Sequence, residues 1–382
     1  MLPDHFFDLQ KTGTLFVSTM TGQSPPYKLI LVLQDLEFGG TQRYTVNLLQ
    51  HLNRGLFSPE LWVLRGGMDM VQLVERTGVR VKWLSRADSV SPFALFRLFL
   101  GLARHRPAVL YSLTVVPNIW ARIFGRLLGL PVVISSCRSM QAKQWERILW
   151  PLSSHIICNA GSIKKKLISC HKVRPERISV VKNGVDTGYF RPSAEKKSPR
   201  PLLLFSGRLE SVKDPLTALR SFQLVLREIP GARMVVTGNG RLAPQLEQFI
   251  REQSLTDHIT LLPGTADVRS FLQESWVLLL SSRNEGSPNI LIEAMACGVA
   301  VVASSVGGVP EIIRHGENGF LVSPGELDAF ARTACMLLKD GNLRTVIGEK
   351  ARESVVASHD VKDCVRLTES IIEGRIHPGN GI

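Results

Sequence analysis

The sequence has few cysteines and no long apolar run, and both absences exclude whole classes of protein. Its six cysteines form no C-x-x-C pair, and several stand inside apolar stretches. This pattern is unlike a disulfide framework or a zinc site, and it predicts reduced, buried thiols in a cytoplasmic protein. No apolar run approaches the ~20 residues that cross a bilayer. The first 28 residues lack a basic start followed by a long apolar run, so we expect no secretory signal.

Aromatic residues are also sparse, at 7%, whereas hydrophobic residues together reach 44%. A chain of 382 residues with this composition can build two cores of moderate size. The formal net charge is +13. A basic excess of this kind favours an anionic partner, and composition alone leaves open a nucleotide, a nucleic acid or a phospholipid surface.

Strand-length apolar runs alternate with helical patterns along most of the chain, in two series. The runs of the first series are 29–33, 61–64, 79–84, 109–111, 132–135, 155–158 and 178–181. Those of the second series are 202–206, 233–237, 259–262, 277–281, 299–303 and 319–322. Such alternation predicts mostly parallel sheets with helices on both faces. We therefore predict an α/β protein of two doubly wound, Rossmann-like domains that face each other across a cleft.

The predicted boundaries follow changes in composition. A polar segment over 1–27 indicates a flexible tail, and a Pro-, Ser- and charge-rich segment over 188–200 indicates a linker. The two domains are then 28–187 and 201–355, and the remaining segment, 356–376, has a helical pattern. In open α/β sheets ligands bind at the carboxyl ends of the strands, so functional motifs are expected there.

The most informative window reads SSRNEGSPNILIEAMACG. Pro288 stands where helices favour starting and Gly298 where they favour ending. The window therefore predicts a short helix, Asn289–Cys297, with Glu293 on it and Glu285 on the incoming loop. The free N–H groups at the start of that helix favour a phosphate, and the two carboxylates can bind different parts of one ligand.

Two further windows carry glycines or cations after predicted strands. Arg208 and Lys213 follow a strand and Gly207, a placement that suits a diphosphate, although two solvated cations would explain it better if it stood alone. Gly39 and Gly40 follow the first strand and allow a close approach of the backbone to a ligand. Gly238 lies in a turn of the dinucleotide-binding type that lacks its third glycine, so a nicotinamide dehydrogenase is disfavoured.

Five motifs in the same order resemble the large retaining glycosyltransferase family 4, also called glycosyl transferases group 1. Glu285 and Glu293 match its E-x7-E signature, and Gly207-Arg208-Leu209 with Lys213 resembles its GRL…K motif. The other matches are Asn183-Gly184-Val185-Asp186, Gly39 to Arg43, Gly264, and Gly307 to Glu311. The resemblance runs from about Leu29 to about Ala351. It implies a GT-B architecture, with the acceptor on the N-terminal domain, the nucleotide sugar on the C-terminal domain, and the final helix packed back on the N-terminal domain.

The resemblance also implies roles. Arg208, Lys213 and Glu285 would be the catalytic residues: the two cations would hold the donor diphosphate and stabilise the leaving group, and Glu285 would contact the donor sugar. Glu293 would bind the ribose hydroxyls. The remaining donor-binding positions implied are Gly39, Gly40, Gly238, Gly264, Asn289, Ile290 and Leu291.

The family usually needs no metal, and the sequence has no D-x-D motif; Asp35-Leu36-Glu37 is interpreted as part of a turn. We therefore expect no metal site and no cofactor besides a UDP- or GDP-linked donor sugar. On the acceptor side the family often has histidines, whereas this chain has none in the stretch 111–114 and has Arg138 at a second such position. Arg138 and Asn118 are the implied acceptor-side residues.

The predicted function is transfer of a sugar from a nucleotide-diphosphate donor to a saccharide or lipid-linked acceptor, in polysaccharide, lipopolysaccharide or glycolipid assembly. The alternatives are a sugar-nucleotide epimerase and a non-enzymatic nucleic-acid-binding protein, although no nucleic-acid motif is present. Residues 91–106 predict a helix packed on the sheet whose edge could meet a membrane. Lys164 to Lys166, with Arg122 and Arg126, could bind anionic lipid there, so we expect a cytoplasmic protein that can associate with the membrane surface.

Overall fold

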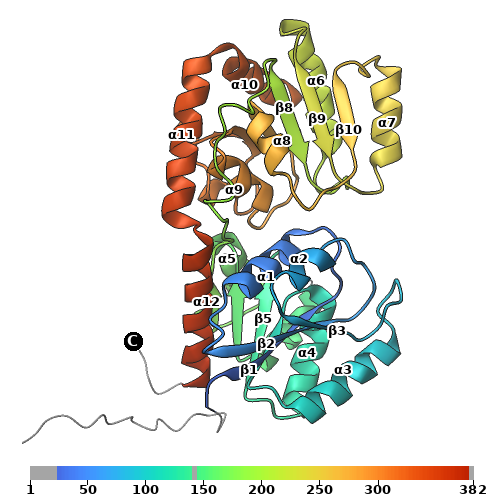
Figure 1. The fold of residues 1–382 in the computed structure, drawn as a ribbon, viewed down its shortest axis with the longest axis vertical. Coiled ribbons are helices and arrows are strands. Elements are labelled where there is room, and N and C mark those ends of the chain that lie inside the picture. Colours follow the sequence, from blue (N-terminus) through green and yellow to red (C-terminus); the bar gives the residue numbers. More distant parts are fainter. Residues whose placement is uncertain (1–23, 140–143, 378–382) are drawn as a thin grey trace, which may run out of the picture.

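The computed structural model describes residues 24–139 and 144–377, which form two α/β domains stacked end to end (Figure 1). The predicted fold class is confirmed, because each domain is built on a parallel sheet with helices on both faces. The tail predicted over 1–27 lies almost wholly outside the described residues. Among the described helices, none has both the length and the apolar character needed to cross a bilayer.

The N-terminal domain holds a seven-stranded sheet in the order β3-β2-β1-β4-β5-β6-β7. Its strands are β1 (Tyr27–Leu33), β2 (Phe57–Val63), β3 (Arg80–Trp83), β4 (Val109–Ser112), β5 (Val132–Cys137), β6 (His155–Cys158) and β7 (Ile178–Val180). Its helices are α1 (Gly40–His51), α2 (Val71–Glu75), α3 (Pro92–His105), α4 (Val115–Leu127) and α5 (Gly161–Ser169), with short 3-10 turns at Gln144–Ile148, Trp150–Leu152 and Pro175–Arg177.

The central strand β1 shows why this sheet is covered on both sides. Leu29, Leu31 and Leu33 pack into the core beneath α1 and α2, whereas Ile30 and Val32 pack into the core beneath α3 and α4. Successive side chains of a strand point to opposite faces, so a continuous apolar run can be buried only between two layers of helices.

The C-terminal domain holds a six-stranded sheet in the order β10-β9-β8-β11-β12-β13. Its strands are β8 (Leu202–Ser206), β9 (Arg233–Thr237), β10 (Ile259–Leu262), β11 (Val277–Leu280), β12 (Ala300–Ser304) and β13 (Phe320–Val322). Its helices are α6 (Pro215–Glu228), α7 (Ala243–Glu252), α8 (Arg269–Glu274), α9 (Asn289–Ala296), α10 (Leu327–Lys339) and α11 (Gly341–Ser358), with a 3-10 turn at Val309–Glu311.

In both sheets the strand order changes direction beside the first strand, between β1 and β4 and between β8 and β11. The loops that follow strands on either side of such a switch point diverge to opposite faces and leave a crevice between them. The two crevices face each other where the domains meet, so the loops after β1 and β8 line the same interdomain space.

Helix α12 (Val361–Ile376) carries the chain back to the N-terminal domain, and Figure 1 shows α11 beside the upper domain and α12 beside the lower one. Val361, Val365, Ile372 and Ile376 of α12 join the core beneath α1. At the crossing, the Val185 N–H donates to the His359 carbonyl. The segment 191–200 contains no helix or strand, yet the Trp276 indole N–H holds the Ser198 carbonyl at 2.9 Å.

A basic side chain, that of Arg122, lies inside the N-terminal domain. Arg122 of α4 is fully buried; its Nε donates to Ser135 Oγ at 3.0 Å and its guanidinium lies 3.7 Å from the centre of the Trp150 ring. Burial lowers the pKa of Arg122 to about 10, and the nearby Glu146 opposes that shift. The expectation that Arg122 belongs to a lipid-binding surface patch is therefore wrong.

Candidate functional site

A cleft of about 790 Å³ lies between the two domains. Its walls come from the loops after β1, β2, β5, β6 and β7 on one side and from the loops after β8, β9, β10 and β11 on the other. The sequence-predicted residues that line it are Gly39, Gly40, Arg138, Arg208, Lys213, Gly238, Gly264, Glu285, Asn289, Ile290 and Glu293. Two predicted residues, Asn118 and Leu291, do not line it.

Lys213 and Glu285 form an ion pair in the wall of the cleft. The lysine Nζ lies 2.5 Å from Oε1 of Glu285, and the Ser282 hydroxyl donates to the same oxygen at 2.7 Å. The side chain of Arg208, in contrast, is exposed and makes no hydrogen bond or ion pair with any residue that the structure describes. The cleft therefore presents one cation held by a carboxylate and a second whose donors are all available to an anionic ligand.

The loops before α6 and α9 are joined to each other, which fixes the position of Lys213. Asp214 caps α6 by accepting from the Thr217 N–H, and it also accepts from Nε of Arg283 at 2.8 Å. The Ser281 hydroxyl donates to the Asp214 carbonyl at 2.7 Å. The backbone next to Lys213 is thus anchored to the strand end that leads to Glu285.

The N-terminus of α9 opens into the cleft. Its first N–H groups have no partner inside the helix, a feature that favours an anion. The Leu291 N–H is already used, since it donates to the Pro288 carbonyl at 3.2 Å. Of the three N–H groups expected at this helix end, those of Asn289 and Ile290 therefore remain for a ligand.

Glu293, one turn further along α9, is the second carboxylate of the cleft. Its side chain is buried, and Nε of Arg43 from α1 lies 3.9 Å away. Burial raises the pKa of Glu293, whereas the positive charge of Arg43 lowers it. Arg43 also donates to the Ala266 carbonyl, so a side chain of the N-terminal domain contacts two parts of the C-terminal domain. The sequence motif contained Arg43, but its spacing gave no signal of this contact.

Several of the predicted glycines are required by neighbouring backbone. A Cβ atom on Gly238 would lie 1.9 Å from the Gly207 carbonyl oxygen, and the Gly264 N–H donates to Oδ1 of Asn239 at 2.8 Å. Gly307 has a φ of +54°, and a Cβ there would lie 1.8 Å from the carbonyl oxygen of Glu285. These contacts let the loops after β8, β9 and β10 pack closely together, and likewise the loops after β11 and β12.

On the N-terminal wall, Arg138 leads to Asn183, which begins the Asn183-Gly184-Val185-Asp186 motif but for which the sequence implied no role in the site. Nη1 of Arg138 donates to Oδ1 of Asn183 at 2.6 Å, and the Arg138 guanidinium lies 3.2 Å from the centre of the Tyr44 ring. The Asn183 amide in turn donates to the Ser287 carbonyl and to Oδ1 of Asn289, at 2.7 and 2.6 Å. Arg138 is thereby connected to the N-terminus of α9, with Asn183 as the link.

Asn118 lies away from the cleft. It is buried, its amide donates to the Ser136 carbonyl at 2.7 Å, and its oxygen accepts from the Ser112 hydroxyl at 2.6 Å. Its amide therefore supports the end of β5, two residues before Arg138, and it does not face the cleft.

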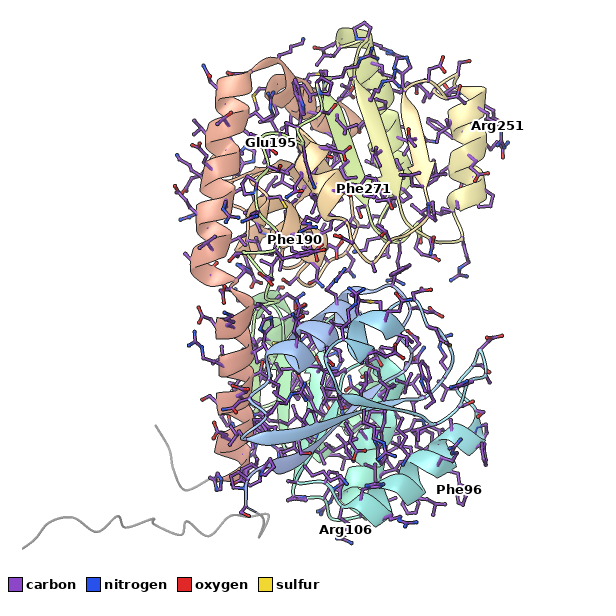
Figure 2. The ribbon with its side chains drawn as sticks, in the orientation of Figure 1. Phe96, Arg106, Phe190, Glu195, Arg251 and Phe271 are labelled. Atoms are coloured by element: carbon purple, nitrogen blue, oxygen red, sulfur yellow. The ribbon has the colours of Figure 1, made fainter. Side chains whose placement is uncertain are left out.

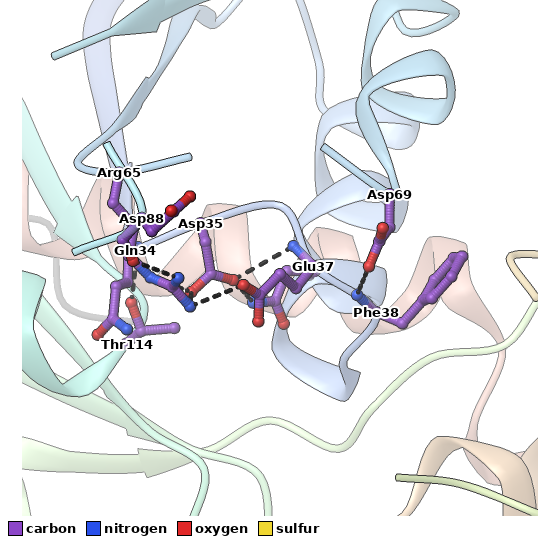
Figure 3. A network of polar contacts seen from close by, with 9 residues as sticks. Gln34, Asp35, Glu37, Phe38, Arg65, Asp69, Asp88 and Thr114 are labelled. Atoms are coloured by element: carbon purple, nitrogen blue, oxygen red, sulfur yellow. Dashed lines mark hydrogen bonds and ion pairs between the residues drawn. The ribbon is translucent and has the colours of Figure 1, made fainter. Parts of the chain in front are cut away.

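The loop after β1 is held by charged side chains, which Figure 3 shows. Asp35 Oδ1 accepts from the Glu37 N–H, and its Oδ2 lies 2.7 Å from Nη2 of Arg65. Asp69 accepts from the Phe38 N–H at 3.1 Å. These bonds agree with the interpretation of Asp35-Leu36-Glu37 as part of a turn, and they position the two glycines that follow. Within 24–139 and 144–377, no three His, Cys, Asp or Glu side chains are grouped as a metal would require.

Two family models match adjoining parts of the chain. The model described as Glycosyltransferase Family 4 matches residues 38–189, and the model described as Glycosyl transferases group 1 matches residues 187–354. Together they cover both domains of the cleft. The chain belongs to the family 4 glycosyltransferases, the GT-B class that its two facing sheets define.

Each of the individual relatives matches about half of the chain. A D-inositol 3-phosphate glycosyltransferase of Mycobacterium marinum is 32% identical over 211 residues, which is 51% of this chain and 43% of that protein. An N-acetyl-alpha-D-glucosaminyl L-malate synthase of Bacillus anthracis is 32% identical over 170 residues, 44% of each chain. The chain thus matches less than half the length of these relatives.

Among solved structures, that of Alr3699/HepE from Anabaena in complex with UDP-glucose superposes with a TM-score of 0.81. The match covers 91% of this chain and all of that one, at 18% sequence identity. This likeness shows that the two chains share a fold.

Proposed function

We propose that the protein transfers a sugar, with retention of anomeric configuration, from a nucleotide-diphosphate donor to an acceptor bound by the N-terminal domain. One observation carries the proposal: Arg208, Lys213, Glu285, Glu293 and the open end of α9 converge on a single cleft. Two cations and a helix N-terminus suit a diphosphate, and two separated carboxylates suit the hydroxyl groups of two sugars.

The positions of these groups support the following roles. Arg208 and the N–H groups of Asn289 and Ile290 bind the diphosphate, and Lys213 stabilises the charge that grows on it as the glycosidic bond breaks. Glu285, held by Ser282, orients the donor sugar. The chemistry uses no metal ion in this scheme, because the cations of the chain supply the positive charge.

The first donor to test is a UDP-sugar. The solved Anabaena protein with the same fold was captured with UDP-glucose, which supports a uridine nucleotide here. GDP-linked sugars are the second choice, since no side chain identified in the cleft selects one base.

We propose that the acceptor carries an acidic group. Residues 28–187 contain 23 Lys and Arg against 9 Asp and Glu, a net charge of +14, whereas residues 188–382 contain 22 of each. The excess charge thus belongs to the acceptor-side domain and is not needed for the donor. The names of two relatives, which contain inositol 3-phosphate and malate, support an anionic acceptor. A saccharide or lipid-linked acceptor of polysaccharide, lipopolysaccharide or glycolipid assembly fits when it bears such a group.

We place the activity in the cytoplasm. The six cysteines are all unpaired, as expected in a reducing compartment.

An assay of the reaction separates the transferase from an epimerase. Transfer of the sugar to an added acceptor, or slow hydrolysis of the donor by water, supports a transferase. Interconversion of two nucleotide sugars without an acceptor would indicate an epimerase.

Thermal-shift measurements with UDP, GDP, ADP and their sugar conjugates test the donor site. A ligand at about 100 times its Kd adds ~2.7 kcal/mol to the free energy of unfolding. Wild type should be stabilised by one nucleotide, and Arg208→Ala should lose that shift. The matched control is Arg241→Ala, because Arg241 is an exposed cation near the same loop that already pairs with Glu210. Equal shifts in all three proteins would refute the assignment of Arg208.

A further inference from the structure

Helix α3 has an apolar stripe on the side that faces solvent. Phe93 is 62% exposed, Phe96 57% and Leu100 49%. These residues are spaced by three and four positions, so they lie on one face of the helix. Figure 2 places Phe96 on the outer side of α3. The opposite face, with Ala94, Leu98 and Leu102, packs in the core beneath α3, whereas the outer stripe belongs to none of the core clusters of the described residues.

Basic side chains surround this stripe. Arg97 and Arg104 lie on the same face as Phe93, at four and eleven positions from it, and both are exposed. At the end of α3, which Figure 2 marks by Arg106, the Arg106 guanidinium donates to the Leu128 carbonyl at the end of α4. This contact brings the exposed Arg126 and Leu127 (71% exposed) close to the end of α3.

The same stretch of chain lacks negative charge. No Asp or Glu occurs from residue 89 to residue 145. The net charge of +14 on residues 28–187, against zero on 188–382, has the same sign and lies in the same domain. An exposed surface that combines aromatic and aliphatic side chains with arginines, and that lacks carboxylates, is complementary to an anionic and partly apolar partner.

We propose that this α3 surface, defined as Phe93, Phe96, Leu100 and Leu127 with Arg97, Arg104, Arg106 and Arg126, binds the surface of an anionic lipid bilayer. The apolar side chains enter the region between headgroups and acyl chains, and the arginines contact the lipid phosphates. Binding is peripheral and reversible, and it falls as salt rises because the arginines act within a Debye length. Such binding does not depend on the proposed transferase activity.

Vesicle flotation of the full chain tests the proposal. The vesicles are equal parts phosphatidylglycerol and phosphatidylcholine, with phosphatidylcholine alone for comparison. Wild type should float with the anionic vesicles and remain behind with the neutral ones. Both the triple variant Phe93→Ser/Phe96→Ser/Leu100→Ser and the variant Arg104→Glu/Arg126→Glu should bind at least about tenfold more weakly, since each basic residue and each buried apolar group adds to the affinity.

The matched controls lie on the C-terminal domain. Met336, Val346 and Val356 are exposed on α10 and α11, and their replacement by Ser removes similar apolar area without touching α3. Arg227→Glu/Arg251→Glu makes the same change of charge as the arginine variant. Both controls should float like wild type. Wild type that stays unbound, or triple and control variants that float equally, would overturn the proposal. Light scattering provides a further test. If wild type self-associates, and the α3 variants alone lose this association while they still bind lipid, the proposal is also wrong. The stripe would then be an interface between two copies of the chain.

Discussion

The ammonium of Lys213 lies 2.5 Å from a carboxylate oxygen of Glu285, although 72 positions separate the two residues. The lysine expected at the diphosphate is therefore paired with the carboxylate expected at the sugar. Each charge offsets the cost of partly burying the other. A bound diphosphate offers Lys213 a second anion, and the Ser282 hydroxyl remains to hold Glu285.

Lys213→Ala should lower stability as well as nucleotide binding, because Glu285 loses its cation while it stays nearly buried. We expect a loss of ~1–3 kcal/mol in the free energy of unfolding. The double variant Lys213→Ala/Glu285→Gln should recover most of that stability but no nucleotide binding, since it removes the unpaired charge without restoring the cation. Urea unfolding and nucleotide titration measure the two effects separately.

The control for this pair is Lys339→Ala. Lys339 and Glu228 lie 2.6 Å apart, but both side chains are about half exposed and far from the cleft. Solvent screens an exposed pair, so this variant should unfold almost like wild type and bind nucleotide normally. If the double variant were no more stable than Lys213→Ala, the pairing of the two cleft residues would not be the cause of the loss.

Glu293 should give the free protein a pH-dependent stability. Burial raises its pKa in the folded chain above that of the unfolded chain. The folded state then binds the proton more tightly, so this contribution to stability is fully present below the unfolded pKa and is lost as the pH rises through the folded pKa. Glu293→Gln should therefore raise the melting temperature at pH 7 and flatten its dependence on pH from 4 upward.

The same variant should bind nucleotide at least about tenfold more weakly if the carboxylate accepts hydrogen bonds from the ribose, because bonds to a charged acceptor are worth ~1.5–3 kcal/mol. The conservative comparison is Glu252→Gln, on the exposed side of α7. If Glu293→Gln is more stable than wild type but binds nucleotide as tightly, the buried charge affects stability only. Glu293 would then not be a donor-binding residue.

Gly307→Ala should displace the backbone of Glu285. Two effects act at Gly307: a positive φ, and a Cβ that would lie 1.8 Å from the Glu285 carbonyl oxygen. Gly325 has a φ of +82° with nothing within 4 Å, so Gly325→Ala carries the conformational strain alone. That strain is ~1 kcal/mol or somewhat more. We expect Gly307→Ala to be clearly less stable than Gly325→Ala in urea unfolding, and to be the one that weakens donor binding.

The sequence predicted the parts of this molecule that depend on local pattern. Strand-length apolar runs located the strands, and the spacing of Glu285 and Glu293 around Pro288 correctly placed one on a loop and the other on α9. The family resemblance identified the residues of one cleft wall. Each of these signals lies within a short window of the chain, where periodicity and capping operate.

Contacts between distant segments could not be predicted in this way. The approach of Arg43 to Glu293 and the link from Arg138 through Asn183 to α9 depend on how the two domains pack. The prediction for Arg122 was wrong because it rested on the usual exposure of arginine side chains. Arg122 follows Asn118 by four positions and precedes Gly125 by three, so helical spacing puts it on the buried face of α4. There its guanidinium donates to the Ser135 hydroxyl and stacks on the Trp150 ring.

A last contact joins the domains outside the cleft, where Glu311 of the C-terminal domain caps helix α5 of the N-terminal domain. Its two carboxylate oxygens accept from the N–H groups of Gly161 and Ser162, each at 2.7 Å. An anion at a helix N-terminus is favoured by the free N–H groups and by the helix dipole. The contact therefore stabilises the arrangement in which both cleft walls are in reach of one donor.

Glu311→Ala should shift the protein toward a more open arrangement without unfolding either domain. The exposed contact is worth ~1 kcal/mol, which corresponds to a change of about fivefold in the ratio of closed to open protein. Small-angle scattering should show a larger radius of gyration, and kcat/KM for transfer should fall by up to about fivefold, the limit reached when the open form predominates. Glu317→Ala is the control, because Glu317 is an exposed carboxylate of the same loop that pairs only within its domain, with Arg314 at 3.4 Å. Unchanged scattering and activity in Glu311→Ala would mean that the contacts of Arg43 and Asn183 suffice to hold the domains together.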